Sequence, residues 1–150
     1  TCKDIHERSI IGALDMLRKE WNSFKAGTIK RELQNESLAT LNTRRKAKDG
    51  KIDWHESNIN IDALIRATTN PYPGAFGYID DKKVILWSST TIDKECNHEP
   101  GPIIKTGEEL IIATGSGYIK ILRLNYEDEP ESNPEIFSLL YNIKPGKIIS

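Results

Sequence analysis

The chain has 150 residues and a net charge of −1, with 37% hydrophobic and 29% charged residues. This length suits one domain, or one domain with a piece of another, and the composition is ordinary for a soluble protein. No apolar run approaches the ~18 residues that a membrane helix needs, and two cysteines, Cys2 and Cys96, are too few for a disulfide framework. We therefore expect a cytoplasmic protein that does not enter a membrane.

Charge is distributed unevenly along the chain. Residues 1–51 hold 12 Lys/Arg and 7 Asp/Glu, a net charge of +5, whereas residues 52–150 hold 9 and 15, a net charge of −6. This asymmetry indicates two parts with different surroundings and argues against a uniformly basic nucleic-acid-binding protein.

The first predicted element is an amphipathic helix over residues 3–26, which Gly27 should end. Its apolar face consists of Ile10, Ala13, Leu14, Leu17, Trp21 and Phe24. Burying Leu17, Trp21 and Phe24 would contribute about 1.5–3 kcal/mol each. We therefore expect this helix to pack against another part of the protein.

Residues 28–51 form a polar connector in which ten of 24 residues are charged. Near its basic end lie Arg44, Arg45 and Lys46. Their side chains can form charge-assisted hydrogen bonds with the phosphates of an acceptor substrate. The alternative is a solvated interdomain linker, and the composition favours it.

A short amphipathic helix should follow, capped by Ser57 or Asn58. Its apolar face is predicted to be Ile61, Leu64, Ile65 and Thr68. The helix should end before Pro71, because a residue preceding proline is pushed out of the α region.

A rigid aromatic turn comes next. Pro71 and Pro73 fix two φ angles, and Gly74 allows a positive φ or a close backbone contact. We expect Phe76 to enter the core beside Trp54 and the apolar face of the helix.

After Phe76 the pattern changes to short apolar runs with period-two alternation. The expected strands are residues 78–79 and 84–87 in a hairpin, then 103–105, 110–114 and 118–124, followed by a short helix from Pro134 and a last strand within 143–149. Their spacing predicts a small antiparallel barrel or sandwich.

Few side chains in residues 52–150 are candidates for catalysis, metal binding or ligand binding. Cys96 and His98 lie in one loop with Glu99, but this falls short of a zinc site, and a surface loop is the better interpretation. The segment Gly115-Ser116-Gly117 is predicted to be a turn. A phosphate loop would need a helix directly after it, and a strand is expected there instead. The aromatic residues on strands, Tyr78, Trp87 and Tyr118, are candidates for stacking but are better explained as core residues.

Several of these strings together resemble one family. They are Ile52-Asp53-Trp54, Ile65-Arg66-Ala67, Asn70-Pro71-Tyr72-Pro73-Gly74-Ala75-Phe76, Pro100-Gly101-Pro102-Ile103, Ala113-Thr114-Gly115-Ser116-Gly117 and Pro145-Gly146-Lys147-Ile148. In this order they are similar to the C-terminal part of methionyl-tRNA formyltransferase-like proteins, which use 10-formyltetrahydrofolate to formylate an amine.

The resemblance implies a mainly β fold with flanking helices (α+β). The expected core is a small open antiparallel β-barrel resembling an OB-fold, preceded by the last helix of a missing α/β domain. The implied domains are residues 1–27, the terminal helix of the N-terminal catalytic domain; residues 28–51, a basic interdomain linker; and residues 52–150, the C-terminal β-barrel domain.

Formyl transfer in this family resembles acid–base chemistry around an Asn, a His and an Asp, with Ser-Leu-Leu-Pro after the His. No such string occurs in residues 1–150, and none of His6, His55 or His98 has that context. We therefore expect no catalytic, cofactor-binding or metal-binding residue in this chain, which should be inactive alone. In the parent enzyme, the resemblance places 10-formyltetrahydrofolate in the N-terminal catalytic domain.

The acceptor is the open question. The net charge of −6 over residues 52–150 opposes tRNA, whose binding depends on neutralised phosphates, and favours an amino-sugar nucleotide. Initiator Met-tRNA is the close alternative. A stand-alone OB-like binding module without catalysis is the alternative of another class, and a homodimer is also compatible with the sequence.

Overall fold

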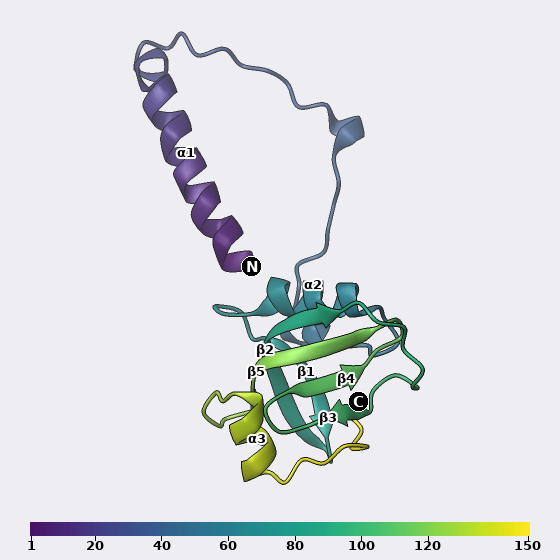
Figure 1. The fold of residues 1–150 in the computed structure, drawn as a ribbon. Coiled ribbons are helices and arrows are strands. Elements are labelled where there is room, and N and C mark those ends of the chain that lie inside the picture. Colours follow the sequence, from purple (N-terminus) through teal and green to yellow (C-terminus); the bar gives the residue numbers. More distant parts are fainter. The chain divides into compact units, whose positions relative to one another are not determined.

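The computed structural model describes residues 1–150, which divide into two compact units: residues 3–45, and residues 46–150 with residues 1–2. The smaller unit contains α1 (Cys2–Lys25) apart from its first residue, and a short 3₁₀ turn, η1 (Glu36–Leu38) (Figure 1). α1 confirms the predicted helix, and Gly27 follows it with a φ of +68°. No residue of α1 is buried. None of the helices has both the length and the hydropathy of a membrane span.

The larger unit is an antiparallel sheet with flanking helices. Its elements are η2 (Ala47–Gly50), α2 (Asn58–Thr68), β1 (Ala75–Ile79), β2 (Lys82–Ile92), β3 (Ile103–Lys105), β4 (Leu110–Ala113), β5 (Tyr118–Tyr126) and α3 (Pro134–Leu140). The strands form one sheet in the order β1-β2-β5-β4-β3, which curls into an open half-barrel (Figure 1). The predicted α+β fold with a small antiparallel barrel is confirmed.

The predicted helix starts and the predicted hairpin are confirmed, and the structure shows the residues that form them. The Ser57 hydroxyl accepts a hydrogen bond from the Asn60 backbone N–H and caps α2, and the Asn133 side chain caps α3, which begins at Pro134. The β1–β2 hairpin turns at Asp80 and Asp81, whose φ angles of 48° and 62° suit a two-residue hairpin turn.

β2 is longer than predicted, because it serves two neighbours. Its first half, up to Leu86, pairs with β1 on one side and with the end of β5 on the other. Its second half, Ser88–Ile92, pairs only with the first part of β5, after a register shift between Leu86 and Ser88. The second half is rich in Ser and Thr, so it carries no apolar alternation for the sequence analysis to detect.

Residues 146–150 span the gap between the two edge strands. On one side, the Ile103 N–H donates to Lys147 O at 2.8 Å and the Ile149 N–H donates to Gly101 O at 3.0 Å. On the other, Tyr78 and Ser150 exchange two backbone hydrogen bonds of 2.7 and 3.0 Å. The predicted last strand is therefore not a regular strand, since the segment changes partner within a few residues and pairs only through isolated bridges and turns.

The core lies inside the curled sheet and is mainly aliphatic. α2 contributes Ile61 and Ile65, while Phe137 of α3 packs on Tyr126 at the end of β5, with ring centroids 5.0 Å apart. α2 is also tied to β2, because Asp62 accepts hydrogen bonds from Ser89 Oγ and from Arg66 Nε, each at 2.7 Å.

Phe76 is buried, as predicted, but on the other face of the sheet. Side chains alternate along β1, and Ala75 and Ile79 take the positions that face the core. Phe76 instead lies opposite Ile85 on the outer face, with the Lys83 ammonium 4.7 Å from its ring centroid. The predicted position beside Trp54 was therefore wrong, although Trp54 itself does enter the core.

Gly74 fulfils the conformation predicted for the aromatic turn. Its φ is +86°, and a Cβ at this position would lie 2.4 Å from Ile85 Cγ2. The turn can therefore press against β2 only with glycine here.

The β4–β5 hairpin tip docks on the segment that precedes α2. The Gly115 N–H donates to Trp54 O at 2.9 Å and to Glu56 O at 3.0 Å, and the Asn58 N–H donates to Ser116 O at 3.0 Å. A Cβ on Gly115 would lie 1.8 Å from His55 O, so only glycine permits this contact.

A small charge network lies at the β3–β4–β5 edge of the sheet. Glu109 accepts hydrogen bonds of 2.6 Å from both Lys105 and Lys120. These two hydrogen bonds, Lys105 first, lower the pKa of Glu109 to about 2.

We predict that Phe76→Ala lowers the free energy of unfolding by about 3 kcal/mol, because it removes a buried ring from the outer face of β1. Leu139→Ala is the matched control, since Leu139 is 82% exposed, and it should change stability by less than about 0.5 kcal/mol. Urea denaturation measures both. Equal effects of the two substitutions would contradict the packing described here.

Gly115→Ala should destabilise the larger unit by about 1–3 kcal/mol, because the added methyl group forces the hairpin tip away from His55. Ser116→Ala is the control at the adjacent exposed position and should be nearly neutral. Thermal melts of the two variants test this. A Gly115→Ala protein as stable as Ser116→Ala would show that the tip is not docked as described.

The Glu109 network should make stability sensitive to acid. Because its folded-state pKa is depressed, the stabilisation is present above the unfolded pKa and is lost as the pH falls from about 4.5 to about 2. Glu109→Gln should therefore flatten the dependence of Tm on pH in that window, whereas Glu99→Gln, at an exposed carboxylate without an ion pair, should not. Parallel pH profiles for Glu109→Gln and the unmodified chain would refute the assignment.

Candidate functional site

The larger unit contains a groove of about 520 Å³ beside the barrel closure. We call it the seam groove, because it lies where the segment entering the domain meets the last residues of the chain. It is lined by Lys51, Ile52, Asp53, Trp54, His55, Pro100, Ile148, Ile149 and Ser150.

Backbone pairing fixes the walls of the seam groove. The Ile52 N–H donates to Phe76 O at 2.9 Å and holds the entering segment along β1. Ser150 pairs with Tyr78 of the same strand, so both walls are attached to β1. The groove is therefore built into the fold and does not depend on flexible side chains.

The rim of the seam groove carries a histidine oriented by a carboxylate. His55 Nδ1 lies 3.0 Å from Asp53 Oδ1, and the His55 backbone N–H donates to the same oxygen at 3.0 Å. The hydrogen bond from the backbone N–H, followed by that from the imidazole, holds the pKa of Asp53 below its usual value. At the other end, Lys51 Nζ lies 5.6 Å from the centroid of the Tyr78 ring.

The basic residues predicted to contact acceptor phosphates lie outside this lining. Arg44, Arg45 and Lys46 are all exposed. Lys46 starts η2, where its backbone N–H donates to Asp49 Oδ2 at 2.7 Å. Their assignment to an acceptor therefore remains a prediction, and the structure brings Lys51 to the groove in their place.

The Cys96–Glu99 loop is attached to β5. His98 Nδ1 lies 2.9 Å from the Tyr118 hydroxyl, and Cys96 Sγ contacts His98 O at 3.5 Å. Nowhere in residues 1–150 do three or more His, Cys, Asp or Glu side chains converge in a way that could hold a metal ion.

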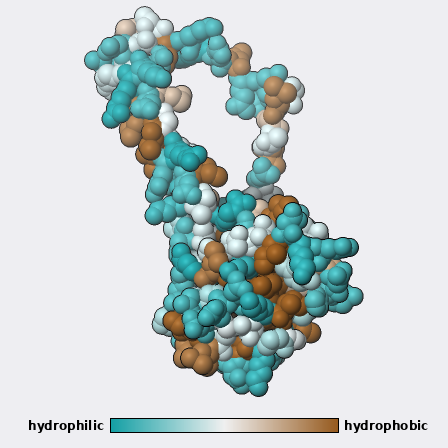
Figure 2. Space-filling view, viewed as in Figure 1, coloured by the Kyte–Doolittle hydropathy of each residue, from teal (hydrophilic) through white to brown (hydrophobic).

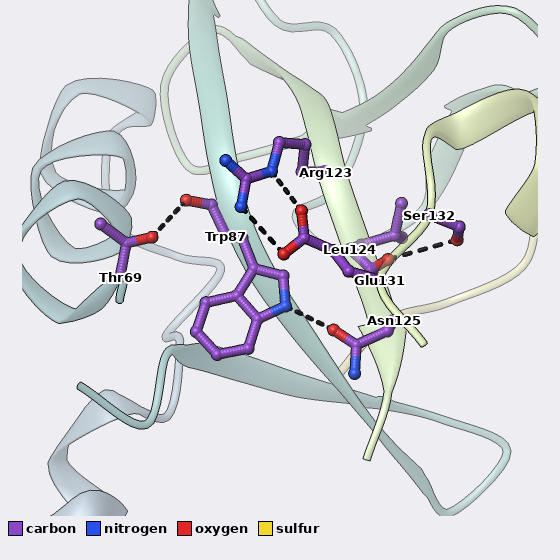
Figure 3. A network of polar contacts seen from close by, with 7 residues as sticks. All are labelled: Thr69, Trp87, Arg123, Leu124, Asn125, Glu131 and Ser132. Atoms are coloured by element: carbon purple, nitrogen blue, oxygen red, sulfur yellow. Dashed lines mark hydrogen bonds and ion pairs between the residues drawn. The ribbon is translucent and has the colours of Figure 1, made fainter. Parts of the chain in front are cut away.

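The three aromatic candidates differ in their surroundings. Tyr118 is buried, as the core interpretation predicted, whereas Tyr78 and Trp87 are half-buried. Trp87 belongs to a polar network on the outer face of the sheet (Figure 3). Its indole N–H donates to Asn125 Oδ1, and its carbonyl accepts from Thr69 Oγ1 at 2.8 Å. The hydrogen bonds of Trp87 therefore connect the end of α2 with β2 and β5.

The same network also fixes the acidic loop after β5. Arg123 forms a two-pronged ion pair with Glu131, and Leu124 and Ser132 exchange backbone hydrogen bonds of 3.1 and 2.9 Å (Figure 3).

The seam groove is not predictable from local sequence patterns, because its lining residues come from three segments that are far apart in the chain. The available signal was that Ile52-Asp53-Trp54, Pro100-Gly101-Pro102-Ile103 and Pro145-Gly146-Lys147-Ile148 were all strings on which the family resemblance depends. The structure brings these three strings together.

Comparison with solved structures finds similar folds. A variant of HypX from Aquifex aeolicus superposes with a TM-score of 0.63 at 15% identity over 88% of this chain. HypX from Aquifex aeolicus in complex with tetrahydrofolic acid superposes with a TM-score of 0.60 at 18% identity over 85% of this chain. At these identities the likeness concerns the fold. The chain spans only about a quarter of HypX, 24% and 22% of the two solved chains.

Comparison with protein families is more specific. The sequence model of the formyl transferase C-terminal domain matches residues 44–139. This range includes η2, the whole five-stranded sheet and nearly all of α3. The chain therefore belongs to the formyl transferase C-terminal domain family.

Proposed function

We propose that this chain is the C-terminal part of an enzyme that transfers a formyl group from 10-formyltetrahydrofolate to the amine of an amino-sugar nucleotide. The observation that carries the proposal is the family match over the barrel, residues 44–139. Formyl transfer to an amine needs a group that accepts the amine proton and a donor that stabilises the oxyanion. The family's Asn, His and Asp set does not occur in residues 1–150. The reacting groups therefore belong to an N-terminal catalytic domain.

The surface of α1 supports the presence of such a domain. Leu14, Leu17, Trp21 and Phe24 are each about half exposed or more, with exposed fractions of 48%, 56%, 50% and 62%. Leu17, Trp21 and Phe24 line a concavity of about 340 Å³ together with Ala13, Met16, Glu20 and Ile29. Figure 2 shows hydrophobic side chains along the helix. An apolar face of this kind is stable in water only when it is covered. We infer that the catalytic domain covers it.

This inference gives the chain three parts. Residues 1–27 are the terminal helix of the catalytic domain, residues 28–51 are the linker, and residues 52–150 are the C-terminal barrel domain. The family match and the larger compact unit begin slightly earlier, at residues 44 and 46, so the end of the linker belongs structurally to the barrel.

A folate cofactor for the parent enzyme is supported by one relative of the same fold. HypX has been solved in complex with tetrahydrofolic acid. We propose that the parent of this chain uses the 10-formyl form of that cofactor, bound by the catalytic domain and not by the barrel.

The charge of the barrel favours an amino-sugar nucleotide over tRNA. Residues 52–150 carry 9 Lys/Arg against 15 Asp/Glu. Six of the nine cationic side chains are already in ion pairs with carboxylates, namely Arg66, Lys83, Lys105, Lys120, Arg123 and Lys147. A tRNA-binding surface needs unpaired cations in a continuous patch to neutralise phosphates. Initiator Met-tRNA is therefore the second candidate.

A stand-alone binding module is the remaining alternative. The barrel fold is compatible with such a module. A module without a catalytic domain would, however, leave the apolar face of α1 exposed to water. The upstream reading frame distinguishes the two, since only the enzyme requires a preceding α/β domain with the Asn, His and Asp set.

We predict that the parent enzyme formylates amino-sugar nucleotides and not Met-tRNA, because most cations of residues 52–150 are already paired with carboxylates. The experiment supplies 10-formyltetrahydrofolate and compares transfer to a panel of amino-sugar nucleotides with transfer to initiator Met-tRNA. The chain of residues 1–150 is the control and should transfer no formyl group. Formylation of Met-tRNA alone would establish the second candidate instead. Micromolar binding of a stable folate analogue by the chain itself, measured by isothermal titration, would mean that the folate site has been misplaced.

A further inference from the structure

The seam groove has the dimensions and the rigidity of a ligand site. Its volume of about 520 Å³ falls in the range of about 300–1,000 Å³ that is usual for small-molecule pockets. Both of its long walls are attached to β1 by backbone hydrogen bonds. A ligand would therefore bind without first ordering a loop, which lowers the entropic cost of binding.

The walls offer an apolar surface to a ligand. Ile52, Trp54 and Ile149 are 2–4% exposed and belong to the core. Ile148, in contrast, lines the groove with 63% of its surface in water. An exposed isoleucine beside buried ones gives a flat ring a hydrophobic surface to cover.

Lys51 is the one lysine in the lining of the groove, and no carboxylate forms an ion pair with it. Lys46 and Lys48, which precede it in the chain, are also exposed and form no ion pair. The acidic residues on either side of Lys51 each accept a hydrogen bond, Asp49 from the Lys46 backbone N–H at 2.7 Å and Asp53 from the His55 backbone N–H at 3.0 Å. An anion arriving here would gain charge-assisted hydrogen bonds without breaking an existing ion pair.

The unpaired ammonium group of Lys51 distinguishes the groove from residues 52–150, where most cations form ion pairs with carboxylates. The groove also offers an acceptor for polar parts of a ligand, because an Nδ1–H that donates to Asp53 leaves Nε2 of the His55 ring as the acceptor.

We propose that the seam groove binds a nucleoside diphosphate. The base and ribose cover Ile148 and the apolar wall, and the diphosphate lies toward Lys51. The proposal rests on the proposed function, in which the nucleoside diphosphate is the nucleotide part of the amino-sugar acceptor. The barrel then anchors the nucleotide while the amine reaches the catalytic domain. The groove suits one nucleotide and not a folded RNA, because its lining holds a single lysine, Lys51.

The test is isothermal titration of residues 1–150 with UDP, GDP, ADP and dTDP, compared with a nucleoside alone and with inorganic diphosphate alone. At least one nucleoside diphosphate should bind, and more tightly than either of its parts. Lys51→Gln should weaken this binding about tenfold, because one charge-assisted contact is lost. Ile148→Ser should weaken it about threefold through lost apolar contact. Lys94→Gln, at an exposed unpaired lysine outside the lining, is the matched control and should change nothing.

Lys51 and Ile148 are both exposed, so neither variant should unfold, and backbone amide NMR spectra of each variant check this. Three results would overturn the proposal: no binding of any nucleoside diphosphate at millimolar concentration, affinities unchanged by both substitutions, or equal affinity for inorganic diphosphate. The outcomes are distinguishable from failure of the proposed function. An active parent whose barrel binds no nucleotide refutes only the groove, and a nucleotide-binding chain whose parent formylates Met-tRNA refutes only the acceptor.

Discussion

The pairing of residues 146–150 with both edges of the sheet is the constraint on which the larger unit depends. The strand order leaves β1 and β3 as edges, and unpaired edge strands expose backbone donors and acceptors to other chains. Residues 146–150 satisfy groups on both edges through Ile103, Gly101 and Tyr78. They also bring Ile149 into the core and place Ile148 on the rim of the seam groove. One short segment thus completes the barrel, closes its core and forms a wall of the candidate site.

The strings that identify the family are largely explained by this architecture. Gly74 lets the aromatic turn press on Ile85, and Gly115 lets the hairpin tip reach His55. Arg66 of the second string pairs with Asp62, which also holds Ser89 of β2. Residues that build the fold are required whatever the acceptor is. This explains why the strings identify the family and leave the acceptor open, so that the acceptor has to be argued from charge and from the groove.

Much of the fold could be predicted because its signals are local. The helix caps at Ser57 and Asn133, the turn at Asp80-Asp81 and the left-handed Gly74 each follow from a few neighbouring residues. The errors concern long-range packing. The second half of β2 pairs with β5 without an apolar pattern, and Phe76 faces outward because Ala75 takes the inward position. The candidate site was less predictable still, since the Asp53–His55 pair becomes a rim only after Ile148 and Pro100 are brought beside it.

The central claim is that α1 belongs to a catalytic domain while residues 46–150 form an independent barrel. Hydrogen–deuterium exchange of the isolated chain and of the parent enzyme tests it most directly, because exchange rates report local stability. In the isolated chain, the amides of α1 should exchange rapidly while those of β2 and β5 remain protected, since α1 has no buried residue. In the parent, α1 should become as protected as the barrel strands. Equal, rapid exchange of α1 in both proteins would contradict the account, and so would strong protection of α1 in the chain alone.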